Sequence, residues 1–343
     1  MKLLIVTQKV DINDPILGFF HRWIIEFAKH FESIVVICLE LGIYELPENV
    51  RVLSLGKENK VSRMSYIRNF YSYIWRERKN YDAVFVHMNQ EYVILAGWLW
   101  RMWNKKVTMW RNHHSGSFLT DAAAFFCNKV FCTSRYSYTA KYTKTVLMPV
   151  GVDLENFSPQ QGIVREKNSI LFLGRFAPSK HPDLLIEALK ILDDEKIDYK
   201  ASIYGDPIES DQKYYESIKQ RVLKYGLGSR IHFFRGVPNH ETPKIYSAHE
   251  VCVNLSSNGM YDKTIFEAMA CGCLILASND NLRGQIDDDF IFRQGDQIEL
   301  AKKLTKLLNL DATEKEKKRQ SLAEFAKKHS LVCSADALFE NID

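Results

Sequence analysis

The sequence predicts an α/β protein built from two doubly wound, mainly parallel sheets. Short apolar runs alternate with helical patterns along most of the chain. The runs are continuously apolar, as expected for parallel strands that are covered on both faces. The alternation breaks once, near residues 149–168, and then restarts, which fits the two domains expected of 343 residues.

The first half is predicted to contain strands joined by helices in right-handed βαβ units. Helices are expected over residues 20–31, 62–79 and 91–103, and the first of these carries one apolar stripe at spacings of three and four. The predicted strands are Lys2–Thr7, Ile34–Leu39, Asp82–Met88, Lys106–Trp110 and Lys129–Thr133.

A domain boundary is predicted where Gly, Pro and Asn cluster in Pro149–Pro159, ahead of a polar segment. We expect domains at 1–150 and 151–325, and a helical segment at 326–343 that packs back on the first domain. The second half is predicted to hold helices at 181–192, 211–225, 241–248 and 263–270, with a Lys-rich helical region from Asp296 onward. Its predicted strands are Ser169–Leu173, Lys200–Tyr204, Ile231–Phe234, Glu250–Leu255 and Leu274–Ala277.

The composition, 46% hydrophobic and 26% charged, excludes a disordered chain, a collagen-like repeat and a polytopic membrane protein. The net charge of +4 (46 Lys+Arg, 42 Asp+Glu) divides unevenly. Residues 1–150 carry 20 Lys+Arg and 12 Asp+Glu, a balance of +8, and the remainder carries 26 and 30, a balance of −4. The basic half also holds all six Trp, so the halves are expected to have different partners: Trp23, Trp75, Trp98, Trp100, Trp103 and Trp110.

The seven Cys form no paired spacing and several lie in apolar runs, so we expect small buried side chains in a reducing compartment and no zinc site. The N-terminus predicts a buried strand rather than a signal peptide. No apolar stretch has the length of a spanning helix, and we expect a cytoplasmic protein.

One candidate binding loop, Gly174–His181, follows a predicted strand and precedes a helix. Gly174 permits a sharp turn, Arg175 offers a planar fork suited to phosphate, and Lys180 offers a compact charge. Ligands bind at the carboxyl ends of strands in open α/β sheets. The alternative is a solvated basic loop.

A second candidate spans residues 256–272, where a Ser/Asn/Gly loop leads into a short helix. Free amides at a helix N-terminus suit a diphosphate. Glu267 lies among apolar neighbours, where its carboxylate needs hydrogen-bond donors, and ribose hydroxyls would supply them. The alternative is a Glu bonded to the backbone or to a neighbouring Lys.

Together these stretches resemble the donor half of retaining glycosyltransferase family 4, the glycosyl transferases group 1. This family has the GT-B fold, in which two Rossmann-like domains face each other across a cleft. The similarity covers about Pro149–Ala277 and is weak before it. The matching motifs are G-R-x-x-x-x-K (Gly174, Arg175, Lys180), E-A-M-A-x-G (Glu267–Gly272), G-V-D…F (Gly151, Val152, Asp153, Phe157), Tyr204-Gly205-Asp206 and Phe234–Pro238.

The resemblance implies that Arg175 and Lys180 bind the diphosphate and serve catalysis, and that Glu267 binds ribose. The family often has a second Glu that contacts the donor sugar, at the position of Gly259. Asp262 or the backbone amides of residues 259–261 would then take its place. The other donor-binding residues that the resemblance implies are Gly18, Gly174, Gly205, Val237, Met260 and Tyr261.

The resemblance to this family is weaker in the first half of the chain. Gly18-Phe19 stands where the family usually has Gly-Gly, and a turn or cap is the alternative. His113 follows the strand Lys106–Trp110 and is our candidate for a catalytic His near the donor sugar, with His114 as the fallback. Adjacent His residues are expected to point in different directions, and a surface or packing role is the alternative for each.

The implied reaction needs no cofactor and no metal, because cationic side chains would stabilise the leaving diphosphate. With retention, the leaving phosphate oxygen would itself take the proton of the acceptor. No carboxylate stands out as a nucleophile for double displacement. A nucleotide-sugar epimerase of the same fold and a non-catalytic, nucleotide-sugar-binding partner subunit remain as alternatives.

Residues 66–79 and 98–106 combine aromatic and cationic side chains, which predicts peripheral contact with an anionic membrane at the cytoplasmic face. The alternative is core-facing helices with solvated Lys and Arg. We expect a UDP-sugar rather than a GDP-sugar as donor, and a glycan or polyprenyl-linked glycan of surface polysaccharide synthesis as acceptor. No nucleic-acid recognition motif accompanies the charge.

Overall fold

The structure is a computed structural model that describes residues 1–14, 16–256 and 260–342. The chain forms two compact units, one of Met1–Gly151 with Leu331–Asp343 and the other of Val152–Ser330. The two domains expected from the sequence end at residue 150 and at residue 325. The chain therefore crosses between the units twice, after Gly151 and after Ser330.

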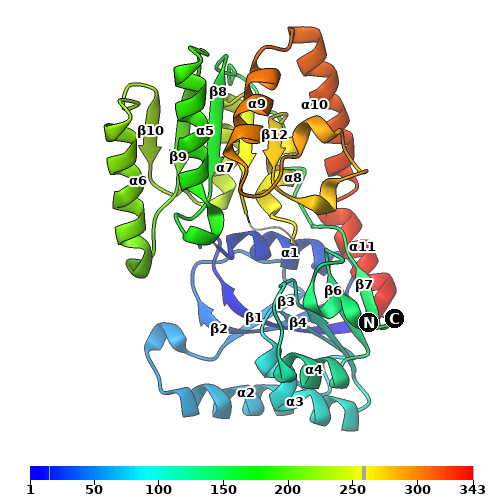
Figure 1. Ribbon diagram of the computed structural model, residues 1–343. Coiled ribbons are helices and arrows are strands. Elements are labelled where there is room, and N and C mark those ends of the chain that lie inside the picture. Colours follow the sequence, from blue (N-terminus) through cyan, green and yellow to red (C-terminus); the bar gives the residue numbers. More distant parts are fainter. Residues whose placement is uncertain (15, 257–259, 343) are drawn as a thin grey trace. The chain divides into compact units, whose positions relative to one another are not determined.

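Unit 1 is built on a seven-stranded parallel sheet with the order β3-β2-β1-β4-β5-β6-β7 (Figure 1). The central strand β1 pairs with β2 on one side and with β4 on the other. Its apolar run, residues 3–6, is fully buried. The strands are β1 (Lys2–Val10), β2 (Ser33–Leu41), β3 (Val50–Ser54), β4 (Ala83–His87), β5 (Lys106–Trp110), β6 (Lys129–Cys132) and β7 (Thr145–Leu147).

Helices cover both faces of this sheet and create two apolar cores. Along β1, Leu3 and Ile5 belong to one core while Leu4 and Val6 belong to the other, because successive side chains point to opposite faces. The first core is covered by α1 (Gly18–Ala28) and α11 (Leu331–Ile342). The second is covered by α2 (Arg63–Glu77), α3 (Gln90–Met102) and α4 (Phe118–Phe126).

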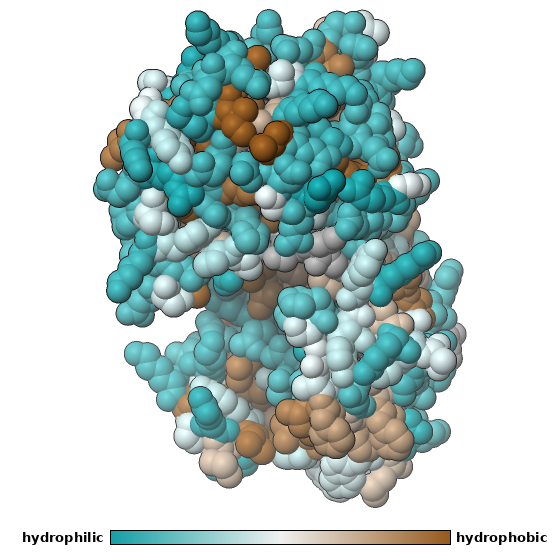
Figure 2. Space-filling view, viewed as in Figure 1, coloured by the Kyte–Doolittle hydropathy of each residue, from teal (hydrophilic) through white to brown (hydrophobic). Residues whose placement is uncertain are grey.

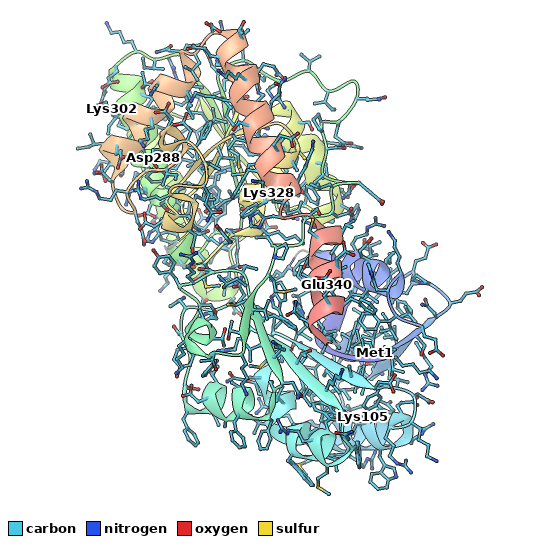
Figure 3. The ribbon with its side chains drawn as sticks, turned by 90° about the vertical axis from the view of Figure 1, so that its right-hand side faces the viewer. Met1, Lys105, Asp288, Lys302, Lys328 and Glu340 are labelled. Carbon is cyan, nitrogen blue, oxygen red and sulfur yellow. The ribbon has the colours of Figure 1, made fainter. Side chains whose placement is uncertain are left out.

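The C-terminal helix α11 belongs to unit 1 although unit 2 precedes it in the chain. Figure 3 shows it, marked by Glu340, beside α1. Its buried residues recur at helical spacing and form one stripe against the first core. These residues are Leu331, Ser334, Ala335, Leu338 and Ile342.

Unit 2 is built on a five-stranded parallel sheet with the order β10-β9-β8-β11-β12. α5 contacts α6 and α9, whereas α8 contacts α7 and α10, so the helices form two layers (Figure 1). The strands are β8 (Ser169–Leu173), β9 (Lys200–Tyr204), β10 (Ile231–Phe234), β11 (Val251–Asn254) and β12 (Leu274–Ala277). The helices are α5 (Pro182–Asp194), α6 (Gln212–Lys224), α7 (Thr242–Ala248), α8 (Lys263–Ala270), α9 (Gln297–Leu308) and α10 (Ala312–Lys327).

The expected α/β class with two parallel, doubly wound sheets is confirmed. Six cysteines are buried as expected, and Cys333 is the exception, since it lies on the exposed side of α11. Within the ranges that the structure describes, no helix combines the length and the apolar character needed to cross a bilayer.

Candidate functional site

The loops that follow β8, β9 and β10 meet at the carboxyl edge of the unit 2 sheet. The backbone amide of Gly174 donates to the carbonyl of Tyr204 at 3.0 Å, and that of Phe176 donates to the carbonyl of Asp206 at 3.2 Å. The amide of Gly236 donates to Oδ2 of Asp206 at 3.0 Å. Three neighbouring loops are thereby fixed at the edge where open α/β sheets bind ligands.

Gly205 is the glycine that this edge requires. Its φ is 152°, and a Cβ there would lie 1.9 Å from the carbonyl oxygen of Gly174. A Cβ at Gly174 would meet only the ring of Phe172, at 3.8 Å. The steric constraint that we expected at Gly174 therefore falls on Gly205, because the loop after β9 passes directly over the loop after β8.

Arg175 and Lys180 lie in the loop after β8 but differ in their surroundings. Arg175 is exposed and makes no hydrogen bond or ion pair with any residue that the structure describes. Nζ of Lys180 donates to Oγ of Ser256 at 2.9 Å and to Oδ2 of Asp262 at 2.5 Å. An ammonium has three donors, so one remains for a ligand.

Asp262 is both the ion-pair partner of Lys180 and the N-cap of α8. Its Oδ2 also accepts from Oγ of Ser256 at 2.6 Å, and its Oδ1 accepts from the amide of Thr264 at 3.2 Å. Burial raises the pKa of the carboxyl, but the charge of Lys180 and these hydrogen bonds prevail and hold that pKa below its usual value. Free amides were expected at the N-terminus of this helix. The amide of Thr264 is not one of them, because it already donates to Asp262.

Glu267 is almost fully buried, at 2% exposure. Its Oε1 accepts from Nδ2 of Asn239 at 3.1 Å, and its Oε2 accepts from the hydroxyl of Tyr246 at 3.4 Å. Burial raises the pKa of Glu267, and the charge of Lys263 one turn earlier opposes this rise. Side chains therefore hold the carboxylate in place, and its contact with ribose stays a prediction.

The loop after β12 supports the segment that leads into α8. Nδ2 of Asn279 donates to the carbonyl of Met260 at 2.5 Å. The hydroxyl of Tyr261 donates to the carbonyl of Asn281 at 3.2 Å. Met260 and Tyr261, both expected near the donor, are consequently held by the next strand's loop.

The structure gives less information about two further residues that were expected to contact the donor, Val237 and Gly259. Val237 is half-buried in the loop after β10, directly before the short turn Asn239–Glu241. Gly259, which stands where the family often has a second Glu, lies outside the described residues.

Gly18 and His113 belong to unit 1, not to the unit that holds Arg175 and Lys180. Gly18 opens α1, and a Cβ there would lie 2.9 Å from the carbonyl oxygen of Ile12. His113 is exposed after β5, and its Nδ1 accepts from the amide of Ser115 at 3.0 Å.

The expectation that His113 and His114 point in different directions is wrong. Their rings stack, with centroids 4.5 Å apart and planes 23° apart. The hydrogen bond from the amide of Ser115 to Nδ1 of His113 fixes the orientation of one of these two rings.

Sequence reasoning missed the residues that position the charged groups. They are polar side chains to which no role was assigned, and their partners are remote in the chain: Ser256 is 76 residues from Lys180, and Asn239 is 28 from Glu267. Only the place of Ser256 just after a strand end gave any signal. Among the residues described, no three His, Cys, Asp or Glu side chains group as a metal site would need.

A family model described as glycosyl transferases group 1 matches residues 153–329. The match covers just over half of the chain and includes Arg175, Lys180 and Glu267. The chain belongs to the glycosyl transferases group 1 family. The residues that match the model therefore all lie in unit 2.

Curated relatives match part of this group 1 chain. A D-inositol 3-phosphate glycosyltransferase of Geodermatophilus obscurus is 28% identical over 153 residues, which are 41% of this chain and 34% of that protein. A mannosylfructose-phosphate synthase of Agrobacterium fabrum is 28% identical over 147 residues, 39% of this chain and 32% of that protein. The chain thus matches about a third of the length of these relatives.

Solved structures match the whole group 1 chain at low identity. HepE of Anabaena in complex with UDP and glucose has a TM-score of 0.78 and 17% identity, covering 100% of this chain and 99% of that one. Sucrose-phosphate synthase of Thermosynechococcus elongatus has a TM-score of 0.76 and 17% identity, covering 100% and 97%. These matches confirm the expected GT-B fold.

Proposed function

We propose that the chain is a retaining hexosyltransferase that moves a sugar from a nucleotide-sugar donor, UDP-linked rather than GDP-linked, to a glycan or polyprenyl-linked glycan acceptor. One observation carries the proposal. An unpaired guanidinium and an ammonium with one spare donor stand on the same loop at the carboxyl edge of a parallel sheet. Membership of the group 1 family and the names of its relatives support it.

Charge explains why this arrangement suits the reaction. Breaking the bond between the sugar and the diphosphate leaves the electron pair on a phosphate oxygen, and the sugar becomes oxocarbenium-like. Positive groups fixed where this charge develops lower the barrier. Arg175 would bind the phosphates as a fork, and Lys180 would bind them as a point charge. With these two cations, no metal is required.

The ion pair with Asp262 gives Lys180 a fixed position. A lysine on a flexible stem otherwise samples many rotamers, and binding a diphosphate would then cost more entropy. Ser256 and Asp262 accept from two of its three donors. Retention requires that the acceptor attack on the face that the diphosphate leaves, so a phosphate oxygen of the leaving group would accept its proton.

A preference for UDP is supported by the solved structure of HepE, which contains UDP and glucose. Its likeness to this chain extends over the full length, although at 17% identity. A uridine nucleotide would place its ribose within reach of Glu267, whose two hydrogen-bond donors, Asn239 and Tyr246, are neutral side chains.

The outer surface of α2, α3 and α4 is proposed as the face that rests on an anionic membrane. Figure 2 shows brown and tan side chains gathered over α3 and α4. Phe118 and Phe125 of α4 are 81% and 73% exposed, and Trp98 and Met102 of α3 are also exposed. Aromatic and apolar side chains flanked by cations suit the interface of anionic lipids.

The same helices explain both interpretations that the sequence allowed. Their inner sides are core-facing, since Phe70, Ile74 and Trp100 are fully buried. Their outer sides carry the exposed apolar residues together with Arg68, Arg76 and Arg101. We call this outer surface the α2–α3–α4 face. It would bring a lipid-linked acceptor to the protein at the cytoplasmic side of the membrane.

The test is turnover of a UDP-hexose by the variants Arg175→Ala and Lys180→Ala, with a membrane extract as acceptor source. We expect kcat/KM to fall by about 100-fold in each, as when a preorganised electrostatic donor is removed. Lys224→Ala changes an exposed lysine at the C-terminal end of α6, the end remote from the loop after β9, and as the matched control it should leave turnover unchanged.

Equal turnover by wild type and both variants would overturn the proposal. Conversion of the donor in the absence of acceptor would instead favour the epimerase. Tight donor binding with no transfer to any extract would favour the non-catalytic partner subunit.

A further inference from the structure

A cavity of about 430 Å³ lies in unit 2 between residues 154–159, the end of α8, and α10. Its volume is in the range of small-molecule sites. None of the proposed donor-binding residues lines it. Much of its wall is apolar, contributed by Leu154, Phe157, Pro159, Ala270 and Ala323.

Arg165 is one of two guanidinium groups in the cavity wall. Its Nε donates to the carbonyl of His249 at 3.0 Å, and its Nη2 donates to the carbonyl of Cys271 at 3.1 Å. In the described part of the chain no carboxylate pairs with it. Burial lowers the pKa of Arg165, and the nearby charge of Arg319 lowers it further. The two cations thus lie close enough to repel each other.

Arg319 of α10 is the second guanidinium, and its hydrogen-bonding capacity is largely unused. Its Nε is buried and has no hydrogen-bond partner among the residues described. Nη2 lies 3.6 Å from Oε1 of Glu250, and Nη1 lies 3.7 Å from Oε2 of Glu316. Both distances exceed a normal hydrogen bond.

Glu250 does not neutralise this pair of arginines. Its Oε1 is 3.0 Å from Nζ of Lys315, and its Oε2 accepts from the amide of Asn168 at 2.9 Å. Arg165, Lys315 and Arg319 therefore share one buried carboxylate. The remaining carboxylate, Glu316, is exposed and screened by water. The cavity wall consequently carries surplus positive charge with donors to spare.

The cavity also adjoins both places where the chain leaves unit 2. Val152 pairs with Ser330, and the amide of Val152 donates to the carbonyl of His329 at 2.9 Å. Residues 154–159 follow the first crossing directly, and α10 ends at Lys327, just before the second. A bound molecule would touch both segments that lead to unit 1.

We propose that this cavity binds a small organic oxyanion, a phosphate or carboxylate attached to an apolar body, at a site separate from the donor site. The oxyanion accepts from Arg165 and Arg319, and the apolar body packs on Phe157 and Pro159.

Isothermal titration calorimetry of the full chain tests the site, with phenyl phosphate and benzoate as separate probes. Phenyl phosphate should titrate two sites, because the donor loop also attracts phosphate. Arg319→Met keeps the side-chain stem and removes the charge, and Ala323→Phe fills the cavity without changing the charge. Each variant should raise the Kd of phenyl phosphate about tenfold or more at one of the two sites. Benzoate should show whether a carboxylate serves as well as a phosphate.

Two controls separate this site from the donor site and from general electrostatics. Arg175→Ala should remove the other phenyl phosphate site and leave this one. Lys317→Met removes an exposed charge from the same helix and should change binding less than about twofold. The proposal is overturned if wild type binds neither probe at millimolar concentration. It is also overturned if Arg319→Met and Ala323→Phe bind as wild type does, or if Arg175→Ala abolishes all binding.

Discussion

The ion pair of Lys180 and Asp262 determines the charge that the candidate site offers a diphosphate. The two residues lie 82 positions apart in the sequence, and the hydroxyl of Ser256 forms hydrogen bonds with both of them. Asp262 offsets the charge of Lys180, so Arg175 carries most of the net positive charge. A diphosphate must therefore compete with one fixed carboxylate, which favours the dianionic or trianionic forms of a nucleotide.

Replacing Lys180 with Met tests this pairing through its pH dependence. The change leaves Asp262 as an uncompensated buried carboxylate and should lower the free energy of unfolding by about 2 kcal/mol at pH 7. The folded-state pKa of Asp262 lies below its usual value. The stability from the pair is therefore present above about pH 4 and is lost as the pH falls further. Urea unfolding followed by circular dichroism at pH 7 and pH 4 measures the difference.

In the variant, burial without Lys180 raises the pKa of Asp262, so its carboxyl is protonated already near pH 4. The deficit against wild type should therefore be smaller at pH 4 than at pH 7. Lys302→Met removes an exposed lysine of α9 (labelled in Figure 3) and should show no deficit at either pH. A Lys180→Met deficit of equal size at both values would contradict a stabilising charge pair between Lys180 and Asp262.

At the residue scale, the sequence could predict the charged groups but not their partners. Arg175 and Lys180 follow a strand end, and that local signal suffices to place them at the sheet edge. Asn239 and Tyr246 reach Glu267 only because α7 and α8 pack together. No local pattern encodes such a contact, since a polar residue on a short helix is equally common at the surface.

At the element scale, burial decided what could be predicted. Strands β5, β8 and β12 are largely buried and begin and end at the predicted residues, because a continuous apolar run marks a strand covered on both faces. Strands β9 and β10 also begin and end at the predicted residues, although they are only partly buried. The strands missed are β3 and β7, which lie at the two edges of the sheet, are short, and are only partly buried. Helix α4 was not predicted, because Phe118 and Phe125 are exposed and its apolar residues therefore do not lie on one side of the helix.

The exposed apolar residues of α4 make a prediction for the α2–α3–α4 face. The double variant Phe118→Ser/Phe125→Ser should reduce binding to vesicles of mixed anionic and neutral phosphatidyl lipids by about tenfold. Two large apolar side chains would no longer enter the lipid interface, and each contributes about 1 kcal/mol or more. Co-sedimentation with vesicles measures the bound fraction.

Val164→Ser is the matched control, because Val164 is 88% exposed but belongs to unit 2. Its binding should equal that of wild type. Vesicles without anionic lipid should bind wild type weakly, since the cations of the face would lose their partners. Equal binding by wild type and the double variant would exclude α4 from a membrane-binding surface.

At the scale of the whole molecule, composition and architecture divide the chain in the same way. All six Trp belong to unit 1, whereas Arg175, Lys180 and Glu267 belong to unit 2. Unit 2 is inserted between the first 151 residues and α11, so the sheet of one unit shares no strand with the other. Tryptophan fluorescence therefore reports unfolding of unit 1 alone, while circular dichroism reports both units.

This division predicts how UDP changes thermal unfolding. A ligand present at 100 times its Kd stabilises the folded state that binds it by about 2.7 kcal/mol, which raises the Tm of a unit of this size by about 5 to 10 °C. The shift should appear in circular dichroism and not in tryptophan fluorescence, because the proposed nucleotide contacts lie in unit 2. The double variant Arg175→Ala/Lys180→Ala should abolish it. Equal shifts by both probes would show that the units unfold as one, and no shift by either would contradict a nucleotide site in unit 2.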